Sequence, residues 1–261
     1  MDTAQSADTS GATRKNAKFW RRQFAPNITT PQIIFDVILG AIAPVLCFLF
    51  DPIAFRGWMM APLFPEYQTF AYLFSGVQIV ILCTWLAARP ANSISNQLIA
   101  GSLLCGALFC VITGLILAPY SLLGLMFGVG VFGFTPFFTA FVYVRNSVRA
   151  VRSGVRCSVA DSGGLMAAAF AIVFSLPLLL SLSIRAAARD AVNDILQGDS
   201  RRADLAAHRL VPLQYLAEAE VNKIVDAYLS EKNEARKAQL KSIYRQITGA
   251  DIDVRARPFN D

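Results

Sequence analysis

Apolar residues are concentrated in five stretches of the chain, each long enough to cross a membrane as a helix. A spanning helix needs about 20 mostly apolar residues, because each residue advances the helix axis by about 1.5 Å. The five stretches cover residues 31–50, 70–88, 98–117, 122–144 and 164–184. Pro119 lies between the third and the fourth, and we expect it to supply the turn that separates them. The pattern predicts an all-α, polytopic membrane protein with a transmembrane helical domain over residues 30–184.

Two segments beside the spans have a different pattern. Residues 1–29 are basic and show no apolar periodicity, which predicts a disordered N-terminal segment. The loop 51–69 is apolar, but three prolines interrupt it. Since irregular backbone is not tolerated in contact with lipid, we expect this loop to be interfacial or shallowly re-entrant.

Residues 185–261 have normal polarity and predict a small soluble helical tail. We expect the fifth helix to continue to Gly198, and Asp199 to cap the next helix. Two further helices, joined near residues 230–233, carry apolar faces at helical spacing and predict an αα-hairpin. The faces contain Leu213, Leu216, Val221, Ile224, Val225 and Tyr228 in the first helix and Leu240, Ile243, Tyr244 and Ile247 in the second. Such faces form either a small packed core or a docking surface, and both interpretations stay open.

Composition supports the membrane assignment. Of the 261 residues, 55% are hydrophobic and 16% are charged, and the mean hydropathy is +0.47. Soluble domains carry about 25% charged residues, so this chain lacks the polar surface of a soluble globule. The net charge is +6, and residues 1–184 hold 11 Lys/Arg against 6 Asp/Glu. Because this excess flanks apolar stretches, it favours anionic lipid headgroups as the partner and argues against nucleic acid.

The distribution of Lys and Arg over the short loops predicts the orientation. With the N-terminus in the cytoplasm, the basic residues on the inner side are Arg14, Lys15, Lys18, Arg21, Arg22, Arg89, Arg145, Arg149, Arg152 and Arg156. The outer side then holds only Arg56, Arg185 and Arg189. The sequence therefore predicts a multi-pass protein of the plasma (inner) membrane, with its tail outside, in the periplasm of a bacterium.

Residues for metal or nucleophilic chemistry are scarce. His208 is the only histidine, which excludes bis-histidine haem and HExxH zinc sites, because both need two imidazoles. The five cysteines contain no CxxC pair, and four of them lie inside predicted spans, where a free cysteine behaves as a small apolar residue. GxSxG and Walker A motifs are absent. We therefore expect no cofactor and no metal, and the sequence favours a protein without catalysis.

Asp36 is the only acidic residue inside a predicted span. A charge within the hydrocarbon layer is unfavourable and normally finds a partner. Arg89 and Arg145 lie at the inner ends of other spans, and we expect Asp36 to pair with Arg145 or to face a polar cavity. A structural ion pair and an ion- or proton-handling group are the two roles that stay open. Gln78 is a further polar candidate inside a span.

Four arginines after the fourth span form a regular pattern. They repeat at the spacing of a helix face, and they are Arg145, Arg149, Arg152 and Arg156. A basic helical stripe beside a span is typical of contact with phosphates. We expect this stripe to face lipid headgroups.

Prolines and glycines predict how the spans bend and pack. Pro44, Pro136 and Pro177 lie within three spans, and each removes a backbone N–H, which predicts a helix break. Gly124 and Gly128 are four residues apart, a spacing that allows two helices to approach closely.

No motif identifies a reaction or a substrate. The sequence favours an integral membrane scaffold or assembly protein without its own catalysis, whose tail binds an envelope partner through residues 199–249. The alternative is a small transporter or channel subunit that uses Asp36 and the proline-broken helices.

Overall fold

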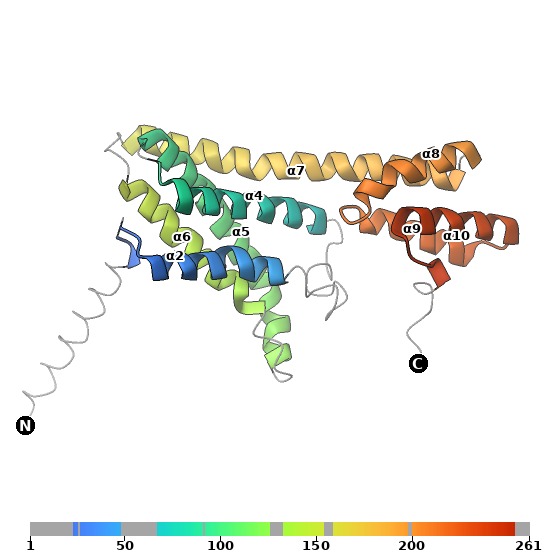
Figure 1. Ribbon diagram of the computed structural model, residues 1–261, viewed down its shortest axis with the longest axis horizontal. Coiled ribbons are helices and arrows are strands. Elements are labelled where there is room, and N and C mark those ends of the chain that lie inside the picture. Colours follow the sequence, from blue (N-terminus) through green and yellow to red (C-terminus); the bar gives the residue numbers. More distant parts are fainter. Residues whose placement is uncertain are drawn as a thin grey trace, which may run out of the picture. The chain divides into compact units, whose positions relative to one another are not determined.

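A computed structural model of the chain describes residues 23–25, 27–47, 67–90, 92–125, 133–153, 159–197 and 200–253. These residues form helices and the turns that connect them, and no strand occurs among them (Figure 1). The helices are α2 (Thr30–Val37), η1 (Ile38–Ile42), α4 (Tyr67–Ala88), α5 (Ser93–Leu125), α6 (Thr135–Ser153), α7 (Val159–Gln197), α8 (Ser200–Leu210), η3 (Val211–Leu213), α9 (Glu218–Ser230) and α10 (Glu234–Thr248). The prediction of an all-α chain is confirmed.

Four helical segments of the described chain are long and apolar enough to cross a membrane. They are Thr30–Cys47, Thr69–Ala88, Ser93–Pro119 and Ser162–Gln197. They coincide with the first, second, third and fifth predicted spans. The predicted fourth span, 122–144, includes residues outside the described ones, and it stays a prediction.

The prolines behave differently from the sequence expectation. Pro119 does not separate two helices, because α5 continues through it to Leu125. Pro177 likewise lies inside α7, which runs without interruption. Pro136 is the second residue of α6, a position where its missing N–H has no intrahelical partner to lose. An apolar stretch that breaks at every proline would leave many backbone groups without partners, whereas a continuous helix leaves few.

Pro44 is the one predicted break at which the helix is irregular. The five residues before Ala43 form a π-helix, η1, and the Ala43 N–H donates to the carbonyl of Ile38. In a π-helix each backbone N–H donates to the carbonyl five residues before it. Pro44 has no N–H, so the carbonyl of Leu39 lacks this backbone partner.

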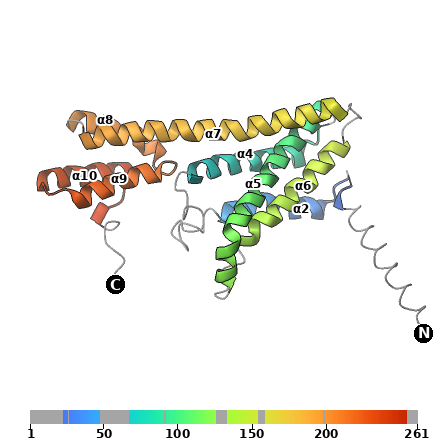
Figure 2. The same cartoon turned by 180° about the vertical axis from the view of Figure 1, so that it is seen from behind.

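The chain divides into two units, Met1–Pro62 with Tyr72–Leu176 and Leu63–Ala71 with Pro177–Asp261. In the first unit α5 and α6 lie side by side (Figures 1 and 2). The core of this unit contains Leu82, Trp85, Leu103, Val142 and Tyr143.

Two glycines allow close approach in the first unit. A Cβ atom added to Gly101 would lie 2.2 Å from the carbonyl oxygen of Met166, so α5 and α7 touch there through their backbones. A Cβ atom added to Gly40 would lie 2.4 Å from Cδ2 of Leu82. Gly124 and Gly128, the pair expected from the sequence, lie where no side-chain surroundings are described.

The second unit contains the C-terminal part of α7 with α8, α9 and α10, which gather beside it (Figures 1 and 2). Its core includes Ile195, Leu210 and Ile224 together with Leu240, Tyr244 and Ile247. Residues from both apolar faces of the expected αα-hairpin are therefore packed inside this unit. They are not available to another protein while the unit is folded.

Side chains close the helix ends in the second unit. The Asn233 side chain accepts hydrogen bonds from the first backbone N–H groups of α10, and Gly249 ends α10 in the left-handed conformation that glycine favours. Nη2 of Arg236 donates to the carbonyls of Ile195 (2.7 Å) and Leu196 (2.8 Å) at the end of α7. A positive charge at this end also complements the helix dipole.

Candidate functional site: a buried ionic network

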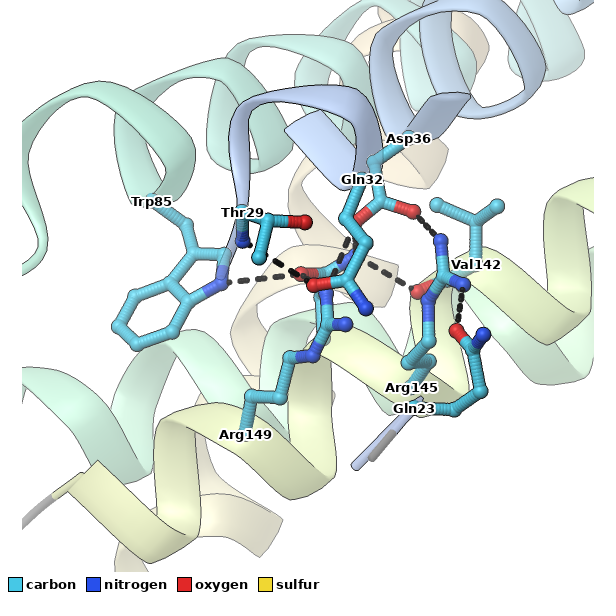
Figure 3. Close-up of polar contacts among 9 residues, drawn as sticks. Gln23, Thr29, Gln32, Asp36, Trp85, Val142, Arg145 and Arg149 are labelled. Carbon is cyan, nitrogen blue, oxygen red and sulfur yellow. Dashed lines mark hydrogen bonds and ion pairs between the residues drawn. The ribbon is translucent and has the colours of Figure 1, made fainter. Parts of the chain in front are cut away.

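A dense polar cluster in the described part of the first unit surrounds Asp36, which is fully buried on α2. The start of α2 is secured because the Thr29 N–H donates to Oε1 of Gln32 at 3.1 Å. Asp36 lies four residues after Gln32, about one helical turn further on, and projects toward α6 (Figure 3). The local helix thus places a buried carboxylate opposite the polar side chains of α6.

Both oxygens of the Asp36 carboxylate are engaged by α6. Oδ1 forms an ion pair with Nη2 of Arg145. Oδ2 accepts from Nη1 of Arg149 and from Nδ2 of Asn146, each at 3.0 Å (Figure 3). Arg145 and Arg149 are one helical turn apart, and the side chains of both are buried.

A second layer of contacts orients these groups. Nε1 of Trp85 on α4 donates to Oδ1 of Asn146 at 3.3 Å. Nη1 of Arg145 donates to Oε1 of Gln23 at 2.8 Å. The rings of Phe35 and Phe141 lie 5.3 and 5.4 Å from the Arg145 guanidinium carbon, within range of cation–π attraction.

The same helix also supplies partners for the irregular turn before Pro44. Oγ1 of Thr139 donates to the carbonyl of Leu39 at 2.8 Å, and the hydroxyl of Tyr143 donates to the carbonyl of Gly40 at 3.0 Å. These are the carbonyls that the π-helix and the proline deprive of regular partners. Helix α6 therefore contacts the segment Thr30–Cys47 at two successive places, the carbonyls of η1 and the carboxylate of Asp36.

The network carries more positive than negative charge. One carboxylate faces two guanidinium groups, so the three ionised groups sum to a net charge of +1. Within the described chain, Nε of Arg145 and both Nε and Nη2 of Arg149 are buried without a hydrogen-bond partner. A buried charge without compensation is unfavourable, so the two buried guanidinium groups depend on the carboxylate of Asp36 for compensation.

The structure brings together only some of the residues expected at this site. The expected pair of Asp36 and Arg145 is present, and Arg149 joins it. Arg89 is exposed at the end of α4, and Asp36 pairs with Arg149 instead. Gln78 lies apart from the network and donates to the carbonyl of Ser102 at 3.1 Å.

The predicted lipid-facing basic stripe is wrong for its first two members. Arg145 and Arg149 point into the protein, because they compensate Asp36 there. Arg152 is exposed, and its Nη1 donates to the carbonyl of Phe24 at 3.0 Å. Arg156 lies outside the described residues. The spacing of four residues between Arg145 and Arg149 was the signal that both could reach one carboxylate.

The arrangement is suited to holding helices together. Asp36 accepts three donors, so its carboxylate has little remaining capacity to accept a proton from a substrate. No group of three or more His, Cys, Asp or Glu side chains with metal-binding geometry occurs in the described part of the chain.

Comparisons with protein-family models, with curated proteins and with solved structures give no match to this chain.

Proposed function

We propose that this protein is an integral membrane scaffold or assembly protein without its own catalysis, and that its C-terminal helical tail binds an envelope partner. The proposed location is the plasma (inner) membrane, with five spans, the N-terminus in the cytoplasm and the tail outside. The observation that carries the proposal is the engagement of Asp36 by Arg145, Arg149 and Asn146. In this arrangement the carboxylate of Asp36, the acidic group of the predicted spans, connects α2 with α6.

Exposed apolar side chains support the membrane part of the proposal. Ile172, Leu176 and Leu179 on α7 are each 61% exposed. Exposed leucine and isoleucine in such numbers on one helix are unfavourable in water and favourable in lipid.

The tail offers a surface for a protein partner that its own core does not use. Leu205 on α8 and Leu229 on α9 are 56% and 57% exposed. Because the apolar faces of α9 and α10 are packed inside the unit, we place the partner on the outer surface of residues 199–249.

Site-specific photocrosslinking in the native cell tests the tail. A benzophenone amino acid is placed at Leu205, at Leu229 and, as a control of matched exposure, at Ile172 on the apolar face of α7. We expect both tail positions to give an adduct with the same protein, and the control to give none. We also expect deletion of the chain to lower the assembled amount of that protein. Adducts from Ile172 alone, or a crosslinked protein that assembles normally without the chain, would refute the scaffold proposal.

The alternative, a small transporter or channel subunit, is favoured by one observation. The network has an excess positive charge, and three buried nitrogen atoms of Arg145 and Arg149 lack a hydrogen-bond partner among the described residues. The double variant Asp36→Asn/Arg145→Gln keeps the network charge at +1 and removes the carboxylate. If it folds and keeps the phenotype of the wild type, ion handling by Asp36 is excluded. If it folds and keeps the crosslink but loses an ion-dependent phenotype, the transporter replaces the scaffold.

A further inference from the structure

The turn between α8 and α9 contacts the residue that precedes the predicted span 70–88. Thr69 directly precedes the predicted span 70–88 and lies three residues after Glu66, the last charged residue before that span. Its side chain is buried, and its hydroxyl donates to the carbonyl of Leu216 in this turn. Since Thr69 marks the end of a span, the residues next to Leu216 lie at the depth where hydrocarbon gives way to headgroups.

Helix α7, which packs on the core of the second unit, indicates the same membrane boundary. Ile184 packs against this core. No charged residue occurs from Ser162 to Ile184, and Arg185 and Arg189 follow directly after this apolar stretch. Arg189 forms an ion pair with Glu220 near the start of α9, so the charged residues that follow the apolar part of α7 lie close to the turn that precedes α9. The core of the tail begins where the apolar part of α7 ends.

The turn presents side chains that suit this level. Tyr215 is 79% exposed, Val211 is 38% exposed, and Pro212 is exposed. Leu210 and Ala217, on either side, are buried and fix the turn to the core. Tyrosine prefers the membrane interface because its ring is apolar and its hydroxyl is polar.

A basic side chain completes the surface. Arg209 is exposed directly before the turn. A guanidinium group at the interface binds phosphate oxygens while its methylene groups stay on apolar surface. The combination of tyrosine, valine, proline and arginine matches a phospholipid layer in both charge and polarity.

We propose that the turn Val211–Tyr215 is seated in the headgroup layer of the leaflet on the tail's side, with Arg209 bound to lipid phosphate. This anchor fixes the tail against the membrane surface and leaves its distal end accessible. The inference rests on the membrane location and is independent of the partner proposed for the tail.

A matched position at the distal end provides the control. Glu220 near the start of α9 lies 3.7 Å from Arg189, whereas Arg236, after the end of α9, binds the carbonyl of Leu196. Helix α9 therefore runs along α7 away from the boundary. Leu229 is exposed like Tyr215, but it lies about 17 Å along α9 from Glu218, the first residue of that helix, at 1.5 Å per residue.

The test uses the full chain reconstituted in vesicles of phosphatidylcholine and phosphatidylglycerol. The variants are Tyr215→Trp and Leu229→Trp, and the added tryptophan emission is the difference from the wild-type chain. Lipid brominated near the headgroup end of its acyl chain quenches tryptophan on contact. We expect it to remove most of the added emission of Y215W and little of that of L229W. Because Tyr215 is exposed, this substitution leaves the packing of the core unchanged.

Three outcomes would overturn the anchor. The first is that neither variant is quenched while the protein resists carbonate extraction, which leaves the membrane assignment intact. The second is equal quenching of both variants, which means that the tail lies flat on the membrane. The third is that Y215W is shielded from aqueous iodide but not quenched by brominated lipid, which means that protein covers the turn.

Discussion

Replacement of Asp36 by asparagine tests whether the buried network holds α2 and α6 together. The variant keeps the size of the side chain and removes its charge, so the network changes from a net charge of +1 to +2. Arg145 and Arg149 then remain buried without a counter-ion, and the amide presents a donor where the carboxylate accepted. Removing one partner of a buried ion pair costs about 3–5 kcal/mol. We expect Asp36→Asn to lower the free energy of unfolding by at least that amount.

The charge balance makes a sharper prediction for the arginines. Arg149→Gln leaves Asp36 paired with Arg145 and reduces the network charge to zero. The loss is then that of one hydrogen bond to a charged group, about 1.5–3 kcal/mol. The double variant Asp36→Asn/Arg149→Gln restores the network charge to +1, so we expect it to be more stable than Asp36→Asn alone. The interaction between contacting groups should be about 0.5–3 kcal/mol.

The assay is unfolding of the purified chain in detergent micelles by SDS, followed by tryptophan emission. Trp85 donates to Asn146 in the network and reports on its disruption. Glu234→Gln is the control, because its pair with Lys237 is exposed and 3.6 Å long. Such a surface pair contributes about 0–1 kcal/mol. The reasoning is refuted if Asp36→Asn is no more harmful than the control, or if Arg149→Gln is as harmful as Asp36→Asn.

Three further predictions concern other parts of the structure. Gly101→Ala should abolish the folded fraction on size-exclusion chromatography, since its Cβ would meet the backbone of Met166, whereas Gly76→Ala, with nothing within 4 Å, should elute as the wild type. Arg236→Gln should destabilise the tail by about 1.5–3 kcal/mol in thermal unfolding, because charged donors to the last carbonyls of α7 are lost; an unchanged midpoint would contradict that capping role. The two backbone N–H groups after Glu231 lower the pKa of its carboxyl, so its stabilisation is present above the ordinary carboxyl pKa and disappears as pH falls through the lowered one. Glu231→Gln should therefore lower the midpoint at pH 7 and converge with the wild type in strong acid; a constant difference at all pH values would exclude this effect.

Much of the fold follows from the sequence because it depends on local properties. A run of about 20 apolar residues predicts a spanning helix wherever it occurs, since the backbone must satisfy its own hydrogen bonds in lipid. Four of the predicted spans correspond to such helices in the described chain. A lone acidic residue in a span also demands a partner, and of the two expected arrangements, a pair with Arg145 or a polar cavity, the structure has the pair.

Proline positions show where local reasoning is insufficient. Pro119 and Pro177 lie inside continuous helices, whereas Pro44 lies beside the π-helix η1. The irregular turn persists because Thr139 and Tyr143, about a hundred residues away, donate to its carbonyls. The effect of a proline therefore depends on the donors that other helices place beside it.

The sequence alone predicted an all-α chain, the four helical segments of the described chain that suit a membrane, and a partner for Asp36. Tertiary structure decided that Arg149 rather than Arg89 forms the second ion pair with Asp36. It also decided that Arg145 and Arg149 point into the protein. It also decided that the apolar faces of the tail meet one another. The physical reason is that helix formation and burial in lipid depend on neighbours along the chain, whereas the pairing of charges and faces depends on which helices come together in space.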